Sequence, residues 1–273
     1  MKTTIYICPV CWQELTEDAT RAVCPRGHAF DRAKEGYFNL LLSERGGVHG
    51  DNRDMILSRK RFLERGYYDG ISARVCEHVV AHMPQGGVLL DEGAGEGFYT
   101  ARMADALETV GREAQLFAFD ISKDAVKLAS RRSKMLRTAV AGIYHMPVAT
   151  ESVDVAVNLF APLAAEETHR VLRAGGIFLL AVPEREHLFS LKEVLYDTPY
   201  KNTVADEALA GFSLLSTEEI RYEATVDGQE ALIDLLRMTP YGYRTPRAGW
   251  ERLMSYERLR IPVHIRLFIY KKV

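Results

Sequence analysis

The sequence of 273 residues has no long apolar run, no strong net charge and few cysteines. No stretch approaches the roughly 20 apolar residues that a membrane-spanning helix needs. Residues 1–7 also lack the apolar core of a signal peptide, so we expect a cytoplasmic protein with no membrane partner. The formal net charge of -2 excludes a polybasic coat for nucleic acid, although it allows a local basic face.

Three of the four cysteines lie near the start of the chain, in the pattern C-x2-C-x12-C-x3-H. Cys8, Cys11, Cys24 and His28 would give zinc three thiolates and one imidazole in a closed structural site. The alternatives are a redox pair, which normally adjoins a βαβ pattern, and a disulfide, which is disfavoured in the cytoplasm. The spacing therefore favours a zinc-binding module over residues 1–36, with much of its folding energy supplied by the metal. Cys76 stands apart on a predicted helix, as a small apolar residue.

The most informative stretch is a short apolar run that ends in Asp91 and is followed by Gly93, Gly95 and Gly97. A helical pattern begins directly after the third glycine. This is typical of a buried parallel strand that turns sharply into a helix. Glycine allows positive φ and close approach of a ligand, and the helix start offers unpaired N–H groups. The stretch predicts the floor of a pocket for a polar cofactor.

The dinucleotide-binding fingerprint requires its third glycine one residue later, where Phe98 stands. The pattern D-x-G-x-G-x-G instead resembles motif I of class I S-adenosylmethionine-dependent methyltransferases, in which the acid helps to orient the methionine part. The next predicted strand ends at Asp120, whose carboxylate could accept hydrogen bonds from both ribose hydroxyls. A purely structural glycine turn and a nicotinamide cofactor are the alternatives.

The rest of the chain alternates between helical and strand patterns, which predicts a parallel sheet with helices on both faces. Residues 43–54 form a polar, glycine-rich loop and are the segment expected to be most mobile. The predicted helices include 55–64, 99–107, one capped by Ser122, 166–172, one starting at 184, and 228–237; a tyrosine-rich loop follows over 238–247. The predicted strands include 138–142, 152–160, 175–183, 219–226 and 261–270, with the last two as an antiparallel pair.

Several local motifs together resemble the bacterial large-subunit (23S) rRNA guanine-N1 methyltransferase family of the RlmA type, over nearly the whole chain. They are the C-x2-C and C-x3-H module, the run from Phe30 to Leu41, the Arg61-Phe-Leu helix and the Gly-Glu-Gly-Phe-Tyr-Thr loop. The resemblance implies a Rossmann-like class I α/β sheet, mostly parallel with an antiparallel C-terminal strand, behind a small zinc-ribbon-like domain. The implied division is a zinc module at 1–36, a linker with N-terminal helices at 37–85 and a methyltransferase domain at 86–273.

The resemblance also implies the cofactors S-adenosylmethionine and Zn²⁺, and methyl transfer to a guanine in an RNA hairpin loop. Relatives suggest a homodimer, and some contribute to resistance to macrolides of the tylosin type. The expected cofactor-binding residues are Tyr68, Asp91, Gly93, Gly95, Glu96, Gly97, Asp120 and His187, of which Tyr68 and His187 rest on the resemblance alone.

Methyl transfer from a sulfonium requires alignment in a dry site more than a nucleophile. The loop after the strand at 152–160 is where this fold presents groups to the acceptor. Asn158, Phe160 and Pro162 are therefore the catalytic candidates, and the Phe160 ring is either a stacking face for a base or a core residue. The sequence identifies no general base.

An RNA substrate needs cations for its phosphates. The expected footprint consists of Arg26, Arg32, Lys34, Arg53, Arg59, Lys60 and Arg61, although interleaved acids also fit a solvated surface. Two other functions stay open: a methyltransferase of the same fold acting on a small molecule, and a non-catalytic zinc-ribbon RNA-binding protein. The intact Asp91, glycines and Asp120 argue against the latter.

Overall fold

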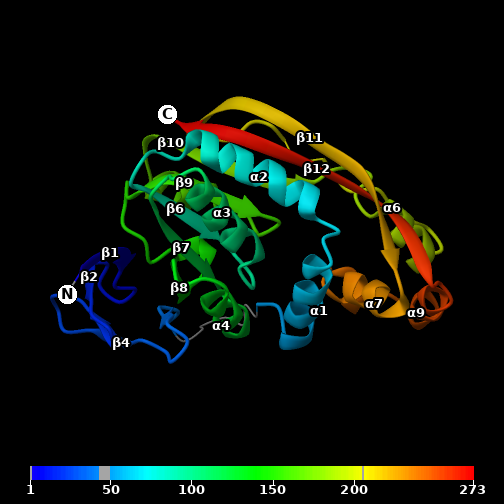
Figure 1. Ribbon diagram of the computed structural model, residues 1–273, viewed down its shortest axis with the longest axis horizontal. Helices are drawn as coiled ribbons and strands as arrows, with labels where there is room; N and C mark the ends of the chain where they lie inside the picture. The colour runs from blue at the N-terminus through cyan, green and yellow to red at the C-terminus, as the bar shows by residue number, and fades with distance from the viewer. Residues whose placement is uncertain (1, 43–49, 205) are drawn as a thin grey trace.

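The computed structural model describes residues 2–42, 50–204 and 206–273, and it contains two separate β-sheets (Figure 1). Of the loop expected over residues 43–54, residues 43–49 lie outside the described part of the chain. After it, the side chain of Asn52 accepts a hydrogen bond from the backbone N–H of Met55 at 3.0 Å and caps the first helix.

The first sheet has four strands, in the order β1-β2-β3-β4, and all of their pairings are antiparallel. The strands are β1 (Lys2–Ile7), β2 (Glu14–Glu17), β3 (Arg21–Val23) and β4 (Ala29–Asp31). This small sheet is anchored on the larger one by Tyr6, which is fully buried and whose hydroxyl lies 3.0 Å from the carbonyl oxygen of Ala118. The module is therefore packed against the main sheet rather than tethered to it.

The second sheet has eight strands, in the order β11-β12-β10-β9-β6-β7-β8-β5. Their bounds are β5 (Phe38–Asn39), β6 (Gly87–Glu92), β7 (Ala114–Asp120), β8 (Leu136–Val140), β9 (Val153–Leu159), β10 (Leu172–Pro183), β11 (Phe212–Asp227) and β12 (Arg258–Lys272). β12 runs antiparallel to both of its neighbours, and the other pairings are parallel. This confirms the expected mostly parallel sheet with an antiparallel C-terminal strand.

Strand β6 is covered on both of its faces, which explains the continuous apolar run Val88–Leu90 in its sequence. Leu89 faces a core that includes residues of α2 (Asp69–His82) and α3 (Phe98–Thr109). Val88 and Leu90 face a second core that includes Tyr6 and Leu15 of the small sheet. Because alternate side chains of a strand point to opposite faces, a strand covered on both faces needs apolar residues throughout. The small sheet thus covers part of one face of the main sheet.

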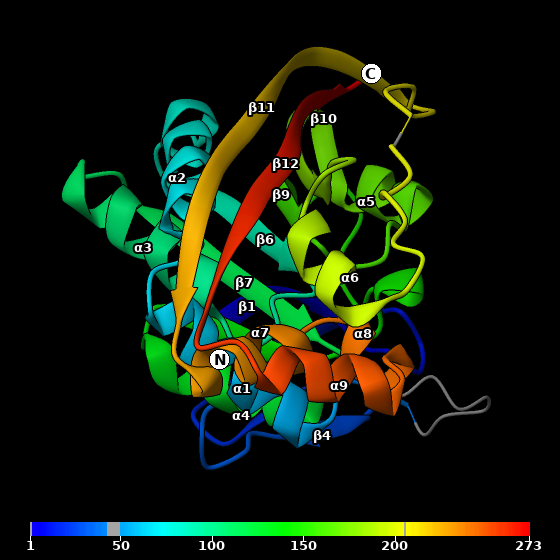
Figure 2. The ribbon, with the colours of Figure 1, turned by 90° about the vertical axis from the view of Figure 1, so that its right-hand side faces the viewer.

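The remaining helices lie around the sheet and beyond one end of its strands. They are α1 (Arg53–Glu64), α4 (Lys123–Arg132), the 3-10 helix η1 (Ile143–His145), α5 (Ala165–Val171), α6 (Phe189–Leu195), α7 (Gln229–Arg237), α8 (Tyr241–Arg244) and α9 (Arg247–Met254). Figure 2 shows the long strands β11 and β12 side by side, with α7, α8 and α9 at the end where the chain passes from one to the other.

Three predictions of local structure need correction. The helix expected from residue 184 begins at Phe189, because Leu188 adopts a left-handed conformation with φ of 57°. The loop expected over 238–247 contains α8 and the start of α9. Ser122 occupies the N-cap position of α4 without a capping hydrogen bond, since its Oγ donates to the carbonyl oxygen of Asp51 at 3.0 Å. Cys76 lies in α2 and is half-buried against the core.

The segment at 37–85 joins both parts of the molecule. Its first residues form β5, which extends the main sheet beside β8, and its helices α1 and α2 pack on the main domain. The division at residues 36 and 85 stays a prediction. Among the residues that the structure describes, no helix is both long enough and apolar enough to cross a membrane.

Helices α1 and α7 are joined by an ion pair between Arg61 and the buried Asp234. The guanidinium donates to both carboxylate oxygens, at 3.0 and 2.5 Å, and the Asp234 side chain is only 1% exposed. An acid buried in this way needs its partner, because a charge left alone in the interior is costly.

We predict that Arg61→Ala lowers the free energy of unfolding by about 2–3 kcal/mol, because it leaves the buried Asp234 carboxylate without its charge partner. Lys60→Ala is the matched control on the same helix. It removes a half-exposed pair with Glu64, which is worth about 0.5 kcal/mol or less. Urea unfolding of both variants measures the difference in the free energy of unfolding. If both variants lose the same amount, the Arg61–Asp234 pair stabilises the fold no more than the exposed Lys60–Glu64 pair.

Candidate functional site

The glycine loop between β6 and α3 has three glycines in the left-handed region, with φ of 81° at Gly93, 56° at Gly95 and 80° at Gly97. A Cβ on Gly93 would lie 2.5 Å from the Cβ of Ala161, and one on Gly97 would lie 2.9 Å from Ala129. A Cβ on Gly95 would meet only the end of Arg59, at 3.8 Å. The first and third glycines are therefore required by packing, and the second leaves open space for a ligand.

Asp120 ends β7 and fixes this loop from the neighbouring strand. One carboxylate oxygen accepts from the backbone N–H of Gly95 at 2.9 Å, and the other accepts from the N–H of Ser122 at 2.8 Å. Burial raises the pKa of Asp120, while the two N–H donors act to lower it. Each oxygen keeps a lone pair, so the carboxylate can still accept two hydrogen bonds from a diol.

Asp91, near the end of β6, is only 2% exposed. Its carboxylate accepts a hydrogen bond from the Thr100 hydroxyl at 2.5 Å, and the described residues include no cation paired with it. Burial raises the pKa of Asp91 to about 7. A ligand carrying an ammonium group would supply the missing countercharge. The pair Asp91 and Asp120 thus fits a cofactor with a cation at one end and a ribose in the middle.

Glu96, expected to bind the cofactor, directs its carboxylate to Arg132 of α4. The Arg132 Nε donates to the carboxylate at 2.5 Å, and the Glu96 side chain is only 1% exposed. This ion pair holds α4 against the loop. Its role toward the cofactor stays a prediction, although Glu96 is among the residues that line the cavity described below.

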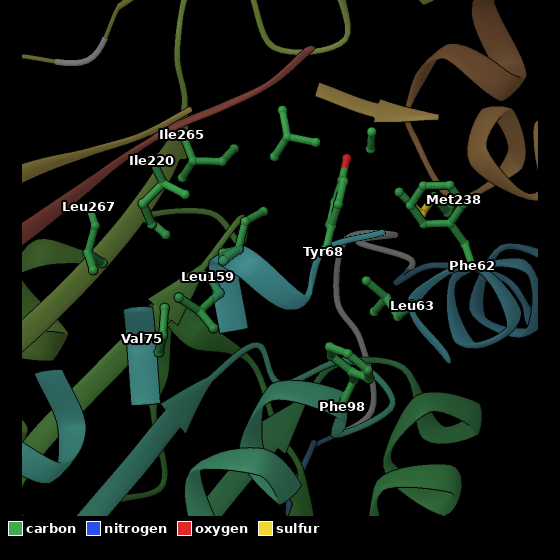
Figure 3. Close-up of a cluster of buried hydrophobic side chains, with 14 of the residues drawn as sticks. Phe62, Leu63, Tyr68, Val75, Phe98, Leu159, Ile220, Met238, Ile265 and Leu267 are labelled. Carbon is green, nitrogen blue, oxygen red and sulfur yellow. The ribbon is translucent and has the colours of Figure 1, made fainter. Parts of the chain in front are cut away.

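Tyr68 and His187 come from segments far apart in the sequence, and their side chains meet. The Tyr68 hydroxyl lies 3.2 Å from His187 Nε2, and Figure 3 shows the ring of Tyr68 among Phe62, Leu63 and Leu159. His187 Nδ1 accepts a hydrogen bond from the backbone N–H of His264, at 3.3 Å. A neutral His187 with Nδ1 as acceptor carries its proton on Nε2 and donates it to Tyr68. The hydroxyl proton of Tyr68 is then free to serve a ligand.

The loop after β9 presents one aromatic ring to solvent. Phe160 has φ of 64°, which is rare for a bulky residue, and its side chain is 40% exposed. This exposure argues against the core interpretation of Phe160, because a core residue would be buried, and its role as a stacking face stays a prediction. Asn158 is fully buried and donates from Nδ2 to the carbonyl oxygen of Pro162 at 3.0 Å, so it shapes the loop from beneath. Its Oδ1 has no partner among the described residues.

The predicted cofactor-binding and catalytic residues, except Gly97 and Asn158, border one cavity of about 870 Å³. Its walls include the glycine loop, Asp91, Asp120, Tyr68, His187, and residues 159–162. Arg59 of α1, expected as an RNA cation, also lines the cavity. Sequence reasoning missed further parts of the wall, among them the stretch 238–241 at the start of α8, and Pro9 and Trp12 between β1 and β2. Nothing local in the sequence signals these residues, because only tertiary packing brings them to the site. The volume suits a large polar cofactor together with part of a second substrate.

The four predicted metal ligands converge at the tip of the small sheet. One ligand atom from each of Cys8, Cys11, Cys24 and His28 lies within 4.8 Å of all the others. The sulfurs of Cys11 and Cys24 are 3.6 Å apart, and His28 Nδ1 is 3.3 Å from the Cys24 sulfur. Two thiolates bound to zinc at 2.3 Å in a tetrahedron lie about 3.8 Å apart, so the geometry fits zinc. The cysteines are free of disulfides, which argues against the disulfide alternative.

The expected RNA footprint divides into paired and unpaired cations. Arg32, Arg59, Lys60 and Arg61 each form an ion pair with an acid of the same chain. Arg26, Lys34 and Arg53 are exposed and form no ion pair with other described residues. The four paired side chains therefore hold segments of the chain together. Among the residues of the expected footprint, the remaining three are the cations available to phosphates.

We predict that His187 makes the protein less stable as the pH falls. Burial, with the nearby charges of His264 and Lys192, lowers the pKa of His187 to about 3. The unfolded chain takes up this proton below about pH 6.5, whereas the folded chain does not, so acid favours unfolding. Between pH 7 and pH 5 the wild type should lose about 2 kcal/mol more stability than His187→Gln. Parallel unfolding curves at the two pH values would contradict this.

Comparison with known proteins agrees with this geometry. A family model described as RlmA, N-terminal, a zinc ribbon, matches residues 6–44, and one described as Methyltransferase domain matches residues 84–233. The chain resembles one chain of a solved structure titled "Complex between the Haloferax volcanii Trm112 methyltransferase activator and the putative methyltransferase", with a TM-score of 0.52 and 19% identity over 82% of this chain and 99% of that one. At this identity the likeness shows the fold alone.

Two relatives are similar in sequence over most of their length. One, from Micromonospora griseorubida, is named "Putative 23S rRNA (guanine-N(1)-)-methyltransferase" and is 35% identical over 97% of both chains. The other, from Streptomyces fradiae, is a 23S rRNA (guanine(748)-N(1))-methyltransferase, 29% identical over 85% of this chain and 84% of that one. The methyltransferase domain implies S-adenosylmethionine as the methyl donor, and the zinc ribbon with its four ligands implies zinc. The chain therefore belongs to the family of 23S rRNA (guanine-N1-)-methyltransferases.

Proposed function

We propose that this protein transfers the methyl group of S-adenosylmethionine to N1 of a guanine in a hairpin loop of 23S rRNA. The observation that carries the proposal is the shared cavity, which is lined by Asp91, Asp120 and the exposed ring of Phe160. The sulfonium supplies an activated methyl group when the cofactor is bound. The chain has to hold donor and acceptor in line and exclude water.

The residues divide this work between holding the cofactor and holding the target base. Asp91 would pair with the ammonium of the cofactor, and Asp120 would accept from its ribose while keeping Gly95 in place. The Tyr68 hydroxyl would donate a hydrogen bond to a polar group of the cofactor. Phe160 would stack on the target base, and Asn158 would act as a positioning residue that holds the Phe160 loop.

A base within folded RNA has to leave its stack to reach such a cavity. Arg26, Lys34 and Arg53 would serve as contacts to the phosphates on the way in. A cytoplasmic location, a homodimer and a contribution to macrolide resistance are further proposals, and they rest on the family resemblance.

The test is methyl transfer from labelled S-adenosylmethionine to unmodified 23S rRNA by the zinc-loaded protein, with the product nucleoside identified by mass. We expect 1-methylguanosine at a single hairpin position, and mapping that position identifies the guanine. Cofactor binding without labelled RNA would instead favour a small-molecule acceptor. Failure to bind the cofactor would favour a non-catalytic RNA-binding protein.

We predict that Gly95→Ala and Gly93→Ala separate cofactor binding from folding. At Gly95 the added methyl group meets open space, so the variant should lose about 1 kcal/mol of stability but bind S-adenosylhomocysteine much more weakly. At Gly93 the methyl group would collide with Ala161, so stability should fall further. Calorimetric titration and thermal unfolding measure the two effects. Full cofactor affinity in Gly95→Ala would place the cofactor elsewhere.

We predict that Phe160→Ala lowers kcat/KM for RNA by about tenfold to a hundredfold, because it removes a stacking face worth roughly 1–3 kcal/mol. Affinity for S-adenosylhomocysteine should stay near that of the wild type. Phe160→Tyr is the matched control, since it keeps the ring and the same backbone preference. If both variants lost activity equally, the ring itself would not be the contact.

A further inference from the structure

The zinc ribbon forms part of the cavity wall because of how β1 docks. Tyr6 forms an antiparallel bridge with Val148, and the N–H of Ile7 donates to the carbonyl oxygen of Pro147 at 2.9 Å. These contacts hold the end of β1, which leads into the first zinc knuckle at residues 8–12, against the segment that follows η1 (Ile143–His145), and η1 itself follows the carboxyl end of β8. The knuckle and η1 both line the cavity.

Trp12 ends this knuckle in an unusual conformation. Its N–H donates to the carbonyl oxygen of Cys8 at 2.8 Å, its φ is 60°, and its side chain is 51% exposed. Within the described residues, four non-glycine residues have positive φ, and three of them, Trp12, Phe160 and Leu188, line this one cavity. Backbone in the left-handed region persists where surrounding structure enforces it, and such positions gather at functional sites.

A second exposed aromatic residue lies in the adjacent segment. Tyr144 of η1 is 58% exposed and lines the same cavity. Arg26, on the second zinc knuckle, is exposed and has no ion-pair partner among the described residues. The mouth of the cavity at the zinc ribbon therefore offers two aromatic faces with a cation on the same small module.

The chemistry of this mouth suits an unpaired nucleotide. Aromatic faces stack on bases of any identity, and a nearby guanidinium attracts the phosphate backbone. The adenine of the cofactor is the alternative occupant, since it would extend past Asp120 toward β8. The high exposure of Trp12 and Tyr144 places them at the rim, whereas a cofactor held by the buried Asp91 and the half-buried Asp120 would lie further inside.

We propose that Trp12 and Tyr144 form a stacking platform for an unpaired base next to the target guanine. The zinc ribbon then contributes directly to the active site, and the zinc knuckle holds a specificity-determining residue. This inference rests on the proposed function and extends it, because it assigns the RNA loop to a particular wall of the cavity.

The first experiment uses fluorescence, because the chain contains only two tryptophans. Trp250→Phe leaves Trp12 as the single tryptophan, and Trp250 does not line the cavity. We expect the hairpin RNA to quench the emission of Trp12, and S-adenosylhomocysteine alone to leave it unchanged. Quenching by S-adenosylhomocysteine alone would assign Trp12 to the adenine and overturn the proposal. Unchanged emission with bound RNA would also overturn it.

The second experiment measures methyl transfer by zinc-loaded variants. Trp12→Ala and Tyr144→Ala should each raise KM for the RNA by about tenfold to a hundredfold, with kcat and S-adenosylhomocysteine affinity near those of the wild type. Trp12→Phe should recover most of the loss. Val10→Ala is the matched control, because Val10 is 48% exposed on the same knuckle but does not line the cavity.

Zinc content and thermal unfolding of each variant show whether the knuckle has stayed folded. Tyr144→Ala keeps the test informative if Trp12→Ala loses zinc, since Tyr144 lies outside the ribbon. If the wild type methylates the RNA and both alanine variants equal it, the stacking platform is wrong and the proposed function stands. If the wild type does not methylate RNA, the proposed function itself has failed.

Discussion

The hydrogen bond from the Gly95 N–H to the Asp120 carboxylate is the constraint on which the site depends. It ties the loop after β6 to the end of β7 and holds Gly95 in a conformation that leaves space above its Cα. The packing of Gly93 against Ala161 and of Gly97 against Ala129 fixes the loop from both sides. A rigid, glycine-lined floor is thus prepared before any ligand arrives, so binding does not have to order it.

The rest of the molecule closes this floor into a cavity. The sheet contributes the carboxyl ends of its parallel strands, where open α/β sheets bind their ligands. Helix α1, held to α7 by Arg61 and Asp234, brings Arg59 to the rim. The zinc ribbon closes the side at β8 through the bridge between Tyr6 and Val148. The metal would therefore stabilise a wall of the cavity in addition to a small fold.

Local sequence patterns predicted the parts of the structure that depend on local chemistry. The four metal ligands, the strand ending in Asp91, the glycine loop and Asp120 follow from spacing and residue type, and the structure brings each group together. The mostly parallel sheet, though not the order of its strands, followed from the alternation of strands and helices. These features are readable because neighbouring residues impose them.

Features that depend on tertiary packing were not readable. The helix expected from residue 184 begins only after Leu188, which adopts a left-handed conformation, and α8 lies within the expected tyrosine-rich loop. The sequence could not show that Phe160 is exposed and has a positive φ, and these two features argue against a core residue. Arg32, Arg59 and Arg61 looked like free cations, but acids from distant segments or turns pair with them.

The most direct test is a crystal structure of the zinc-loaded protein with S-adenosylhomocysteine and its RNA hairpin. The account predicts Asp120 on the ribose hydroxyls, the ammonium at Asp91, and the target guanine flipped against Phe160 within the cavity. A cofactor bound away from the glycine loop, or an RNA loop bound to a surface remote from the cavity, would contradict it.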